Sequence, residues 1–186
     1  MDVIRATLLQ EGAWLNDICV LRLAQLMLRH QQLQHCVALV DSICLADWLA
    51  KGRYADALRA PPQCRMQLMP VHHADHWSLL VRCYETRQWL HLDSLGGYHA
   101  HYVARLVDAL DAHYGGDAFA RFSPPLIGQV ALWECGLYAL MYVWLMLRWP
   151  PNSDLAAHCA KYRPALCEEN RRLFTEKMLD LLATAA

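Results

Sequence analysis

The most constraining feature of this chain is an apolar segment, GLYALMYVWLMLRW, that runs from Gly136 to Trp149. The segment is apolar almost all round, so a helix formed from it has no polar face to turn toward water. It spans about 14 residues, which is short of the roughly 20 that a helix needs to cross a bilayer. We therefore expect a buried central helix, with the rest of a single domain, residues 1–186, packed around it.

Composition limits the classes of partner. The chain has 186 residues, 56% of them hydrophobic, which is enough for one sizeable core. Its 17 basic and 18 acidic residues nearly cancel and form no basic run, so no nucleic acid partner is expected and any partner is bound by shape. We expect no membrane association and a monomer.

The N-terminus and the cysteines predict the compartment. The first residues lack the basic start and long apolar stretch of a secretory signal. The eight cysteines show neither paired CxxC spacing nor a small secreted framework, so most are expected to be reduced core residues. Both features predict an intracellular protein, cytoplasmic or nuclear, or one acting in the cytosol of a host cell.

Periodicity predicts helices around a small sheet. Apolar spacing indicates helices over residues 15–30, around 103–110 and near the C-terminus, with Asn16 or Asp17 capping the first. The stretch 37–58 is interpreted as one or two short helices. Short alternating runs at 66–73, 76–84 and 88–94 predict adjacent strands, and 118–122 a further one. This order predicts an α+β domain.

Cys135 is placed unlike the other seven cysteines. It lies where a loop runs into the apolar segment, and the unpaired N–H groups and the dipole at a helix start favour a thiolate there. Nucleophilic catalysis also needs a base beside the sulfur. Gly136, which follows, is interpreted as leaving room for a substrate.

His76 and Asp93 are the candidate base and its partner. His76 opens one predicted strand and Asp93 closes the next, so antiparallel pairing brings them together. A turn centred on residues 85–87 pairs residue i with residue 172 minus i, which puts Asp93 about three residues away from ideal pairing with His76. An Asp there would orient the imidazole, leaving its other nitrogen to take the proton of Cys135.

These residues belong to four short motifs in one order along the chain. They are Trp14-Leu15-Asn16-Asp17, His76-Trp77-Ser78-Leu79-Leu80-Val81, His91-Leu92-Asp93-Ser94, and Gln129 followed six positions later by Cys135-Gly136-Leu137-Tyr138. These motifs resemble those of the ubiquitin-like-protein-specific cysteine proteases, the SUMO and NEDD8 proteases of clan CE.

The resemblance implies a papain-like fold and a role for each matching residue. His76 is implied as general base, Asp93 as its partner and Cys135 as nucleophile, with Gln129 as a side-chain donor to the oxyanion. Trp14 and Trp77 are implied as walls of a narrow tunnel around the Gly-Gly tail of the substrate, and the small glycines fit there because they lack Cβ atoms. Asp17 is implied either as a substrate contact or as a helix cap.

The resemblance implies a protease or isopeptidase that cleaves after the terminal Gly-Gly of SUMO, NEDD8 or ubiquitin, without a cofactor or metal. The compact chain looks closer to the small NEDD8-type members. The loop before Cys135 departs from the family in its apolar content and in having Glu134 where Asp is usual. Alternatives are an effector deubiquitinase, a viral polyprotein-processing protease, an effector acetyltransferase and a binding module without catalysis.

Other side chains have simpler interpretations. The spacing of His72, His73 and His76 is too loose for a zinc site. His158 and Cys159 are adjacent in a helical region, so their side chains point apart and are expected to be structural. Ser94 lacks the surroundings of a nucleophile and is interpreted as a cap or turn residue.

Overall fold

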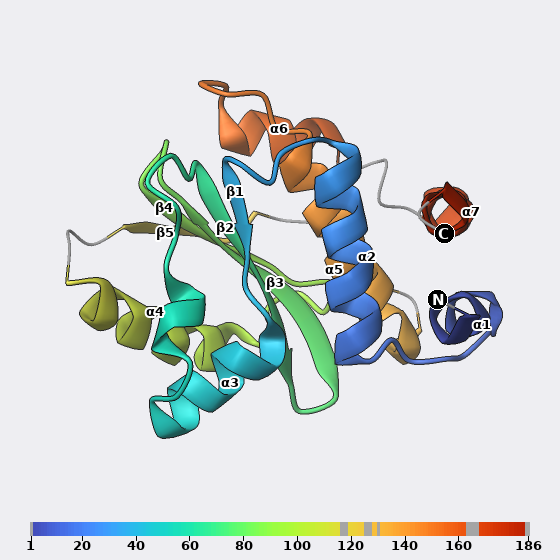
Figure 1. Cartoon of the computed structure of the whole chain (residues 1–186), viewed down its shortest axis with the longest axis horizontal. Helices are drawn as coiled ribbons and strands as arrows, with labels where there is room; N and C mark the ends of the chain where they lie inside the picture. Colours follow the sequence, from blue (N-terminus) through green and yellow to red (C-terminus); the bar gives the residue numbers. More distant parts are fainter. Residues whose placement is uncertain (1, 116–118, 125–127, 130, 163–167, 185–186) are drawn as a thin grey trace.

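The computed structural model describes residues 2–115, 119–124, 128–129, 131–162 and 168–184. Its centre is a five-stranded sheet with the order β1-β2-β3-β4-β5 (Figure 1). The strands are β1 (Val37–Leu39), β2 (Met66–His73), β3 (His76–Cys83), β4 (Gln88–Leu92) and β5 (Ala120–Phe122). The middle three strands pair antiparallel, and each edge strand pairs parallel with its neighbour.

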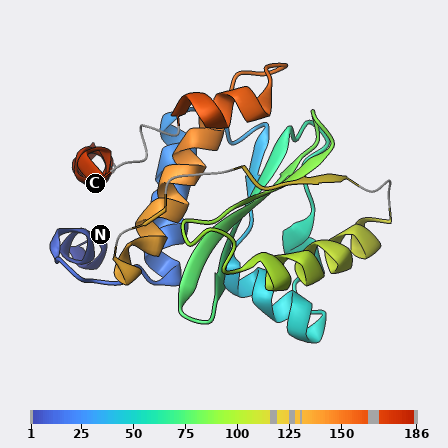
Figure 2. The same ribbon diagram turned by 180° about the vertical axis from the view of Figure 1, so that it is seen from behind.

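Helices cover both faces of the sheet. One face carries α2 (Asp17–His30) and α5 (Cys135–Leu147), with α1 (Asp2–Leu9) and α7 (Glu168–Thr184) outside them (Figure 1). The other face carries α3 (Ser42–Lys51) and α4 (Ala100–Tyr114), which the reverse view shows clearly (Figure 2). The remaining helices are α6 (Leu155–Tyr162) and the 3-10 turns η1 (Ala55–Leu58) and η2 (Leu132–Glu134).

The central strand β3 separates two hydrophobic clusters. Because successive strand residues point to opposite faces, Leu79 and Val81 join the cluster under α2 and α5, whereas Leu80 joins the cluster under α3 and α4. All eight residues of β3 are buried. The strand therefore has a core on both sides, which fixes the position of its first residue, His76.

The apolar segment forms α5, whose residues are buried except Trp144. It packs between β3 and α2, so the expectation of a buried central helix is confirmed. Within the described ranges, no helix combines the length and apolar character needed to cross a membrane.

The predicted order of elements largely agrees with the structure. β2, β3 and β4 occupy the predicted runs, and β5 lies within the predicted 118–122, of which residue 118 is outside the described ranges. The register is shifted by one, because Leu79 faces Leu92 where the prediction placed Asp93. The stretch 37–58, interpreted as helical, begins instead with β1, because residues 37–39 find a pairing partner in β2.

Candidate active site

His76 and Asp93 meet at one end of the sheet. His76 begins β3 after a tight turn through Ala74 and Asp75, both with positive φ, and Asp93 follows the last residue of β4. The Nε2 atom of His76 lies 2.7 Å from Oδ1 of Asp93. The two predicted partners are therefore brought together, and both side chains are almost fully buried.

The Asp93 carboxylate is held in its charged form. Its Oδ1 also accepts the backbone N–H of Leu95 at 2.9 Å, and its Oδ2 accepts that of His99 at 3.0 Å. Burial alone would raise the pKa of Asp93, but the hydrogen bonds from His76, His99 and Leu95 outweigh burial and hold this pKa far below its usual range.

The imidazole of His76 also interacts with the side chain of Cys135. Because Asp93 occupies Nε2, Nδ1 is the ring nitrogen left for the thiol. Burial lowers the pKa of His76, but the hydrogen bonds and charges of Asp93 and Cys135 outweigh burial and raise this pKa to about 9. A neutral solution therefore favours a protonated imidazole beside the sulfur, which is the arrangement that stabilises a thiolate.

Cys135 is the first residue of α5 and is fully buried. The preceding 3-10 turn, η2, ends at Glu134, which is 2% exposed. Its carboxylate accepts the backbone N–H of Ala131 at 3.1 Å. Glu134, which departs from the family pattern, thus stabilises the turn that places Cys135 beside His76.

Gln129 is anchored to Ser94, the residue after Asp93. The hydroxyl of Ser94 donates to Oε1 of Gln129 at 2.6 Å, and the carbonyl of Ser94 accepts the Gln129 backbone N–H at 3.0 Å. Gly128 makes this contact possible, since a Cβ there would come within 2.8 Å of the Ser94 carbonyl oxygen. Ser94, interpreted from sequence as a cap or turn residue, therefore orients Gln129, which lies six residues before Cys135.

The amide nitrogen of Gln129 is occupied in this structure. Nε2 donates to the carbonyls of Ala131 at 3.0 Å and Leu132 at 3.1 Å. An amide nitrogen has two N–H donors, so both are in use. To donate to an oxyanion, Gln129 must therefore break its hydrogen bond to one of these two carbonyls and form one to the reacting oxygen.

The interpretation of Gly136 as space for a substrate is wrong. A Cβ on Gly136 would come within 2.8 Å of the Cβ of Leu15, so the space belongs to the first motif. The indole Nε1 of Trp77 donates to the carbonyl of Leu15 at 2.9 Å. Leu15 is therefore the point where the first motif is fastened to both β3 and α5.

The two tryptophans expected to form a tunnel have different surroundings. Trp14 is 47% exposed, whereas Trp77 is 1% exposed. The ring of His72 stacks on Trp77 at 4.5 Å between centroids, so one face of this indole is already covered. The structure brings the two motifs together but leaves only Trp14 widely open to solvent.

Asn16 and Asp17 have different contacts at the start of α2. Asn16 is the cap, because its side chain accepts the backbone N–H of Cys19 at 2.9 Å. Asp17 instead accepts the hydroxyl of Ser42 at 2.6 Å. It thereby joins the starts of α2 and α3.

His158, which the sequence predicted to be structural, has a buried polar contact. His158 is buried, and its Nε2 lies 2.9 Å from the carbonyl of Leu145. In the part of the chain that the structure describes, no group of three or more His, Cys, Asp and Glu side chains is arranged to hold a metal ion.

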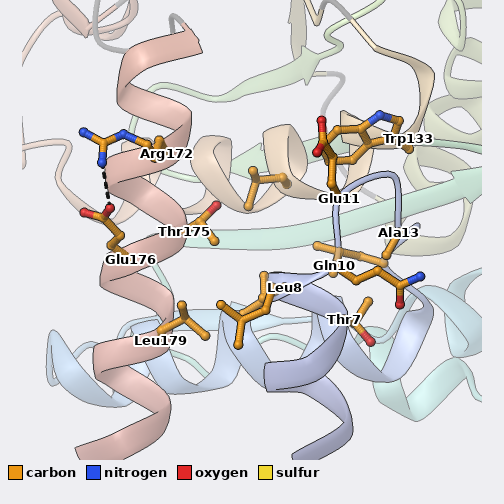
Figure 3. A pocket seen from close by; sticks show the side chains of 13 residues that line it. Thr7, Leu8, Gln10, Glu11, Ala13, Trp133, Arg172, Thr175, Glu176 and Leu179 are labelled. Atoms are coloured by element: carbon orange, nitrogen blue, oxygen red, sulfur yellow. Dashed lines mark hydrogen bonds and ion pairs between the residues drawn. The ribbon is translucent and has the colours of Figure 1, made fainter.

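A pocket of about 380 Å³ lies beside the turn that precedes Cys135 (Figure 3). Its walls come from α1, the loop after it, and α7, and they include Trp133 and Leu137, which lie two residues before and after Cys135. Arg172 and Glu176 form an ion pair at 3.0 Å on its α7 side.

Comparison with known proteins places this site in a family. Residues 61–178 match the family described as the Ulp1 protease family, C-terminal catalytic domain. The chain belongs to the Ulp1 protease family. It is accordingly a cysteine peptidase, and the family predicted from its motifs is confirmed. The matched range includes His76, Asp93, Gln129 and Cys135 but begins after the first motif.

Solved structures share the fold of this Ulp1 family member. The C-terminal Ulp1 protease domain in complex with Smt3, the yeast ortholog of SUMO, is 16% identical with a TM-score of 0.68, covering 97% of this chain and 82% of that one. The Xanthomonas campestris effector XopD bound to ubiquitin is 21% identical with a TM-score of 0.64, covering 92% and 93%. No curated protein matches. The likeness confirms the predicted α+β fold.

Proposed function

We propose that this protein cleaves after the C-terminal Gly-Gly of a ubiquitin-like protein, with Cys135, His76 and Asp93 as its triad. The observation that carries the proposal is His76, held by Asp93 at 2.7 Å and interacting through its other side with Cys135. The backbone holds the two residues on either side of His76. Two N–H groups bind the carboxylate of Asp93, and Cys135 is the first residue of α5. We also propose that the protein cleaves its substrate inside a cell.

The reaction follows from the charges. The Cys135 thiolate attacks the carbonyl carbon of the terminal glycine and forms a tetrahedral oxyanion. The protonated His76 gives its proton to the leaving amine, the C–N bond breaks, and a thioester remains. His76, now neutral, takes a proton from water, whose oxygen displaces the sulfur and releases the glycine carboxylate.

Gln129 and the first motif complete the proposed site. Gln129 supplies an amide N–H to the oxyanion after releasing the carbonyl of Ala131 or Leu132, together with the backbone N–H of Cys135. Trp14 and Trp77 confine the Gly-Gly tail, and His72 leaves the face of Trp77 when the tail enters. Asp17 is the proposed substrate contact at the start of α2.

The substrate class is tested with C-terminal electrophilic probes built on ubiquitin, SUMO and NEDD8, followed by intact mass. Two solved relatives suggest the first two arms, because one was determined with a SUMO ortholog and the other with ubiquitin. We expect labelling by at least one probe, its loss in Cys135→Ala, and its retention in Cys44→Ala, a half-exposed cysteine of α3.

Two outcomes would reject parts of the proposal. Labelling of Cys135→Ala would remove Cys135 as nucleophile. If the folded wild-type protein reacts with none of the three probes, ubiquitin-like tails are not its substrates, and polyprotein processing or acetyl transfer becomes the function to test.

A further inference from the structure

The Asp93 carboxylate is oriented partly by the residue that precedes α4. Oδ1 receives His76 Nε2 at 2.7 Å and the N–H of Leu95 at 2.9 Å, while Oδ2 receives the backbone N–H of His99 at 3.0 Å. The direction in which Asp93 faces His76 therefore depends on where the chain enters α4. His99 lies outside the four motifs that resemble the protease family.

The side chain of His99 is fixed at both ring nitrogens. It is 1% exposed, with Nε2 at 2.7 Å from the carbonyl of His73 and Nδ1 at 2.9 Å from the hydroxyl of Ser78. A carbonyl only accepts, so Nε2 carries the hydrogen and Nδ1 of the neutral ring accepts from Ser78. The Ser78 oxygen can then accept from Nε2 of His91 at 3.2 Å.

This proton arrangement requires a neutral His99. Its ring lies edge-on to that of His76, with 4.7 Å between centroids, so a charge on His99 would oppose the charge on His76. Burial, together with the charge on His76, lowers the pKa of His99 to about 4, although the hydrogen bond to the His73 carbonyl raises it. The titratable groups around the ring are His73 of β2, His76 of β3, His91 of β4, Asp93 after β4, and Tyr98 and Tyr102 at the start of α4.

We propose that His99 is a positioning residue of this peptidase: as a neutral imidazole bridging His73 and Ser78, it fixes the entry to α4 and so holds Asp93 against His76. The inference rests on the proposed triad. His99 is buried and does not reach the substrate, so it acts on the proton-transfer step through Asp93. Without this anchor, Asp93 turns away and stabilises the charged form of His76 less.

The test compares His99→Phe, which keeps the ring but removes both hydrogen bonds, with His101→Phe, the same change at an exposed position of α4. Turnover is measured on a fluorogenic C-terminal derivative of whichever ubiquitin-like protein labels Cys135. For His99→Phe we expect kcat to fall about 10- to 100-fold with KM within about twofold, since proton transfer but not binding is affected. The alkaline limb of its pH profile should move to lower pH.

Ser78→Ala is a second variant, which removes the hydroxyl that donates to Nδ1 of His99 and accepts from Nε2 of His91. It should shift the alkaline limb in the same direction and unfold at a lower temperature than wild type, because both buried ring nitrogens lose this partner. An unshifted limb and wild-type kcat in both His99→Phe and Ser78→Ala would overturn the positioning role. If His99→Phe does not fold, the Ser78→Ala profile alone decides.

Iodoacetamide modification of Cys135, followed by peptide mass in wild type, separates this failure from failure of the proposed function. Modification at neutral pH together with unshifted variant profiles rejects only the role of His99. A wild type in which Cys135 neither alkylates nor reacts with any probe rejects the proposed triad and the positioning role together.

Discussion

Gly136 shows how one missing side chain controls the approach of two distant segments. The residue follows Cys135 in α5, and the space where its Cβ would lie is taken by Leu15 from the loop before α2. The same Leu15 carbonyl accepts the Trp77 indole at 2.9 Å. The glycine is therefore required by the contact between the first motif and the catalytic helix.

We expect Gly136→Ala to lower the free energy of unfolding by about 1–3 kcal/mol, the range for overpacked cores. Chemical denaturation measures the change, and probe labelling should slow because the start of α5 shifts. Leu15→Gly in the same chain should recover part of the loss, since it removes the Leu15 Cβ that the new side chain would meet at 2.8 Å. A double variant as unstable as the sum of the two single variants would contradict the contact.

The contact between His76 and Asp93 leads us to expect that activity falls at alkaline pH. The pKa of His76 is raised to about 9 in the fold, above about 6.5 for an unperturbed histidine. The imidazole of His76 is therefore protonated in the folded protein below pH 9, and it loses this proton as the pH rises through about 9. The stability that this proton adds is complete below pH of about 6.5 and disappears over the same rise.

We expect kcat/KM to fall as the pH passes 9, because His76 no longer has a proton for the leaving amine. Asp93→Asn removes the charge that supports the imidazolium, so this limb should move to lower pH and the rate at neutral pH should drop by about 100-fold or more. A limb that stays in place in Asp93→Asn, in a variant that unfolds like wild type, would exclude Asp93 as the partner of His76.

At the scale of elements, the start of α2 combines a cap and a tether. Asn16 accepts the Cys19 N–H and satisfies one donor of the first turn, while the neighbouring Asp17 reaches Ser42 of α3. The two polar residues thus set where α2 begins and which helix it faces. Trp14 is carried on the same short segment.

Asn16→Ala should destabilise the protein by about 1 kcal/mol, the usual cost of losing a cap. Asn16→Asp is the matched control, since its carboxylate accepts the same N–H and suits the positive end of the helix dipole. Thermal unfolding should therefore separate the two variants by several degrees. Equal melting temperatures would show that the cap contributes nothing to stability.

At the scale of the whole molecule, the sheet is the common wall of both hydrophobic clusters. β3 supplies Leu79 to one and Leu80 to the other, so neither cluster can be lost without exposing a face of the same strand. α7 completes the first cluster with Met178, which is fully buried, whereas Leu173 of the same helix is 47% exposed.

We expect one cooperative unfolding transition, with tryptophan fluorescence and far-UV circular dichroism coinciding. Met178→Ala should lower the stability by about 2–5 kcal/mol in both signals, and Leu173→Ala by less than about 1 kcal/mol. If Met178→Ala instead unfolds in two steps, with part of the circular dichroism signal lost before the fluorescence changes, the proposed single domain of residues 1–186 would be contradicted.

The amino-acid sequence by itself determined the central helix and the middle strands, and it identified the candidate reactive groups. The apolar segment predicted α5, the alternating runs predicted β2 to β4, and the motifs predicted His76, Asp93 and Cys135 as residues of one site. These features are local in the chain, so periodicity and residue type are enough to predict them. The family followed from the same motifs.

Only the tertiary structure decided the contacts between segments distant in sequence. β1 was missed because three residues acquire strand geometry through pairing with β2. The residue that fills the space beside Gly136, the link between Ser94 and Gln129, and the bridge made by His99 all depend on which atoms of distant segments meet. Periodicity carries no information on such meetings, because hydrogen bonds and close packing are set by the three-dimensional path of the chain.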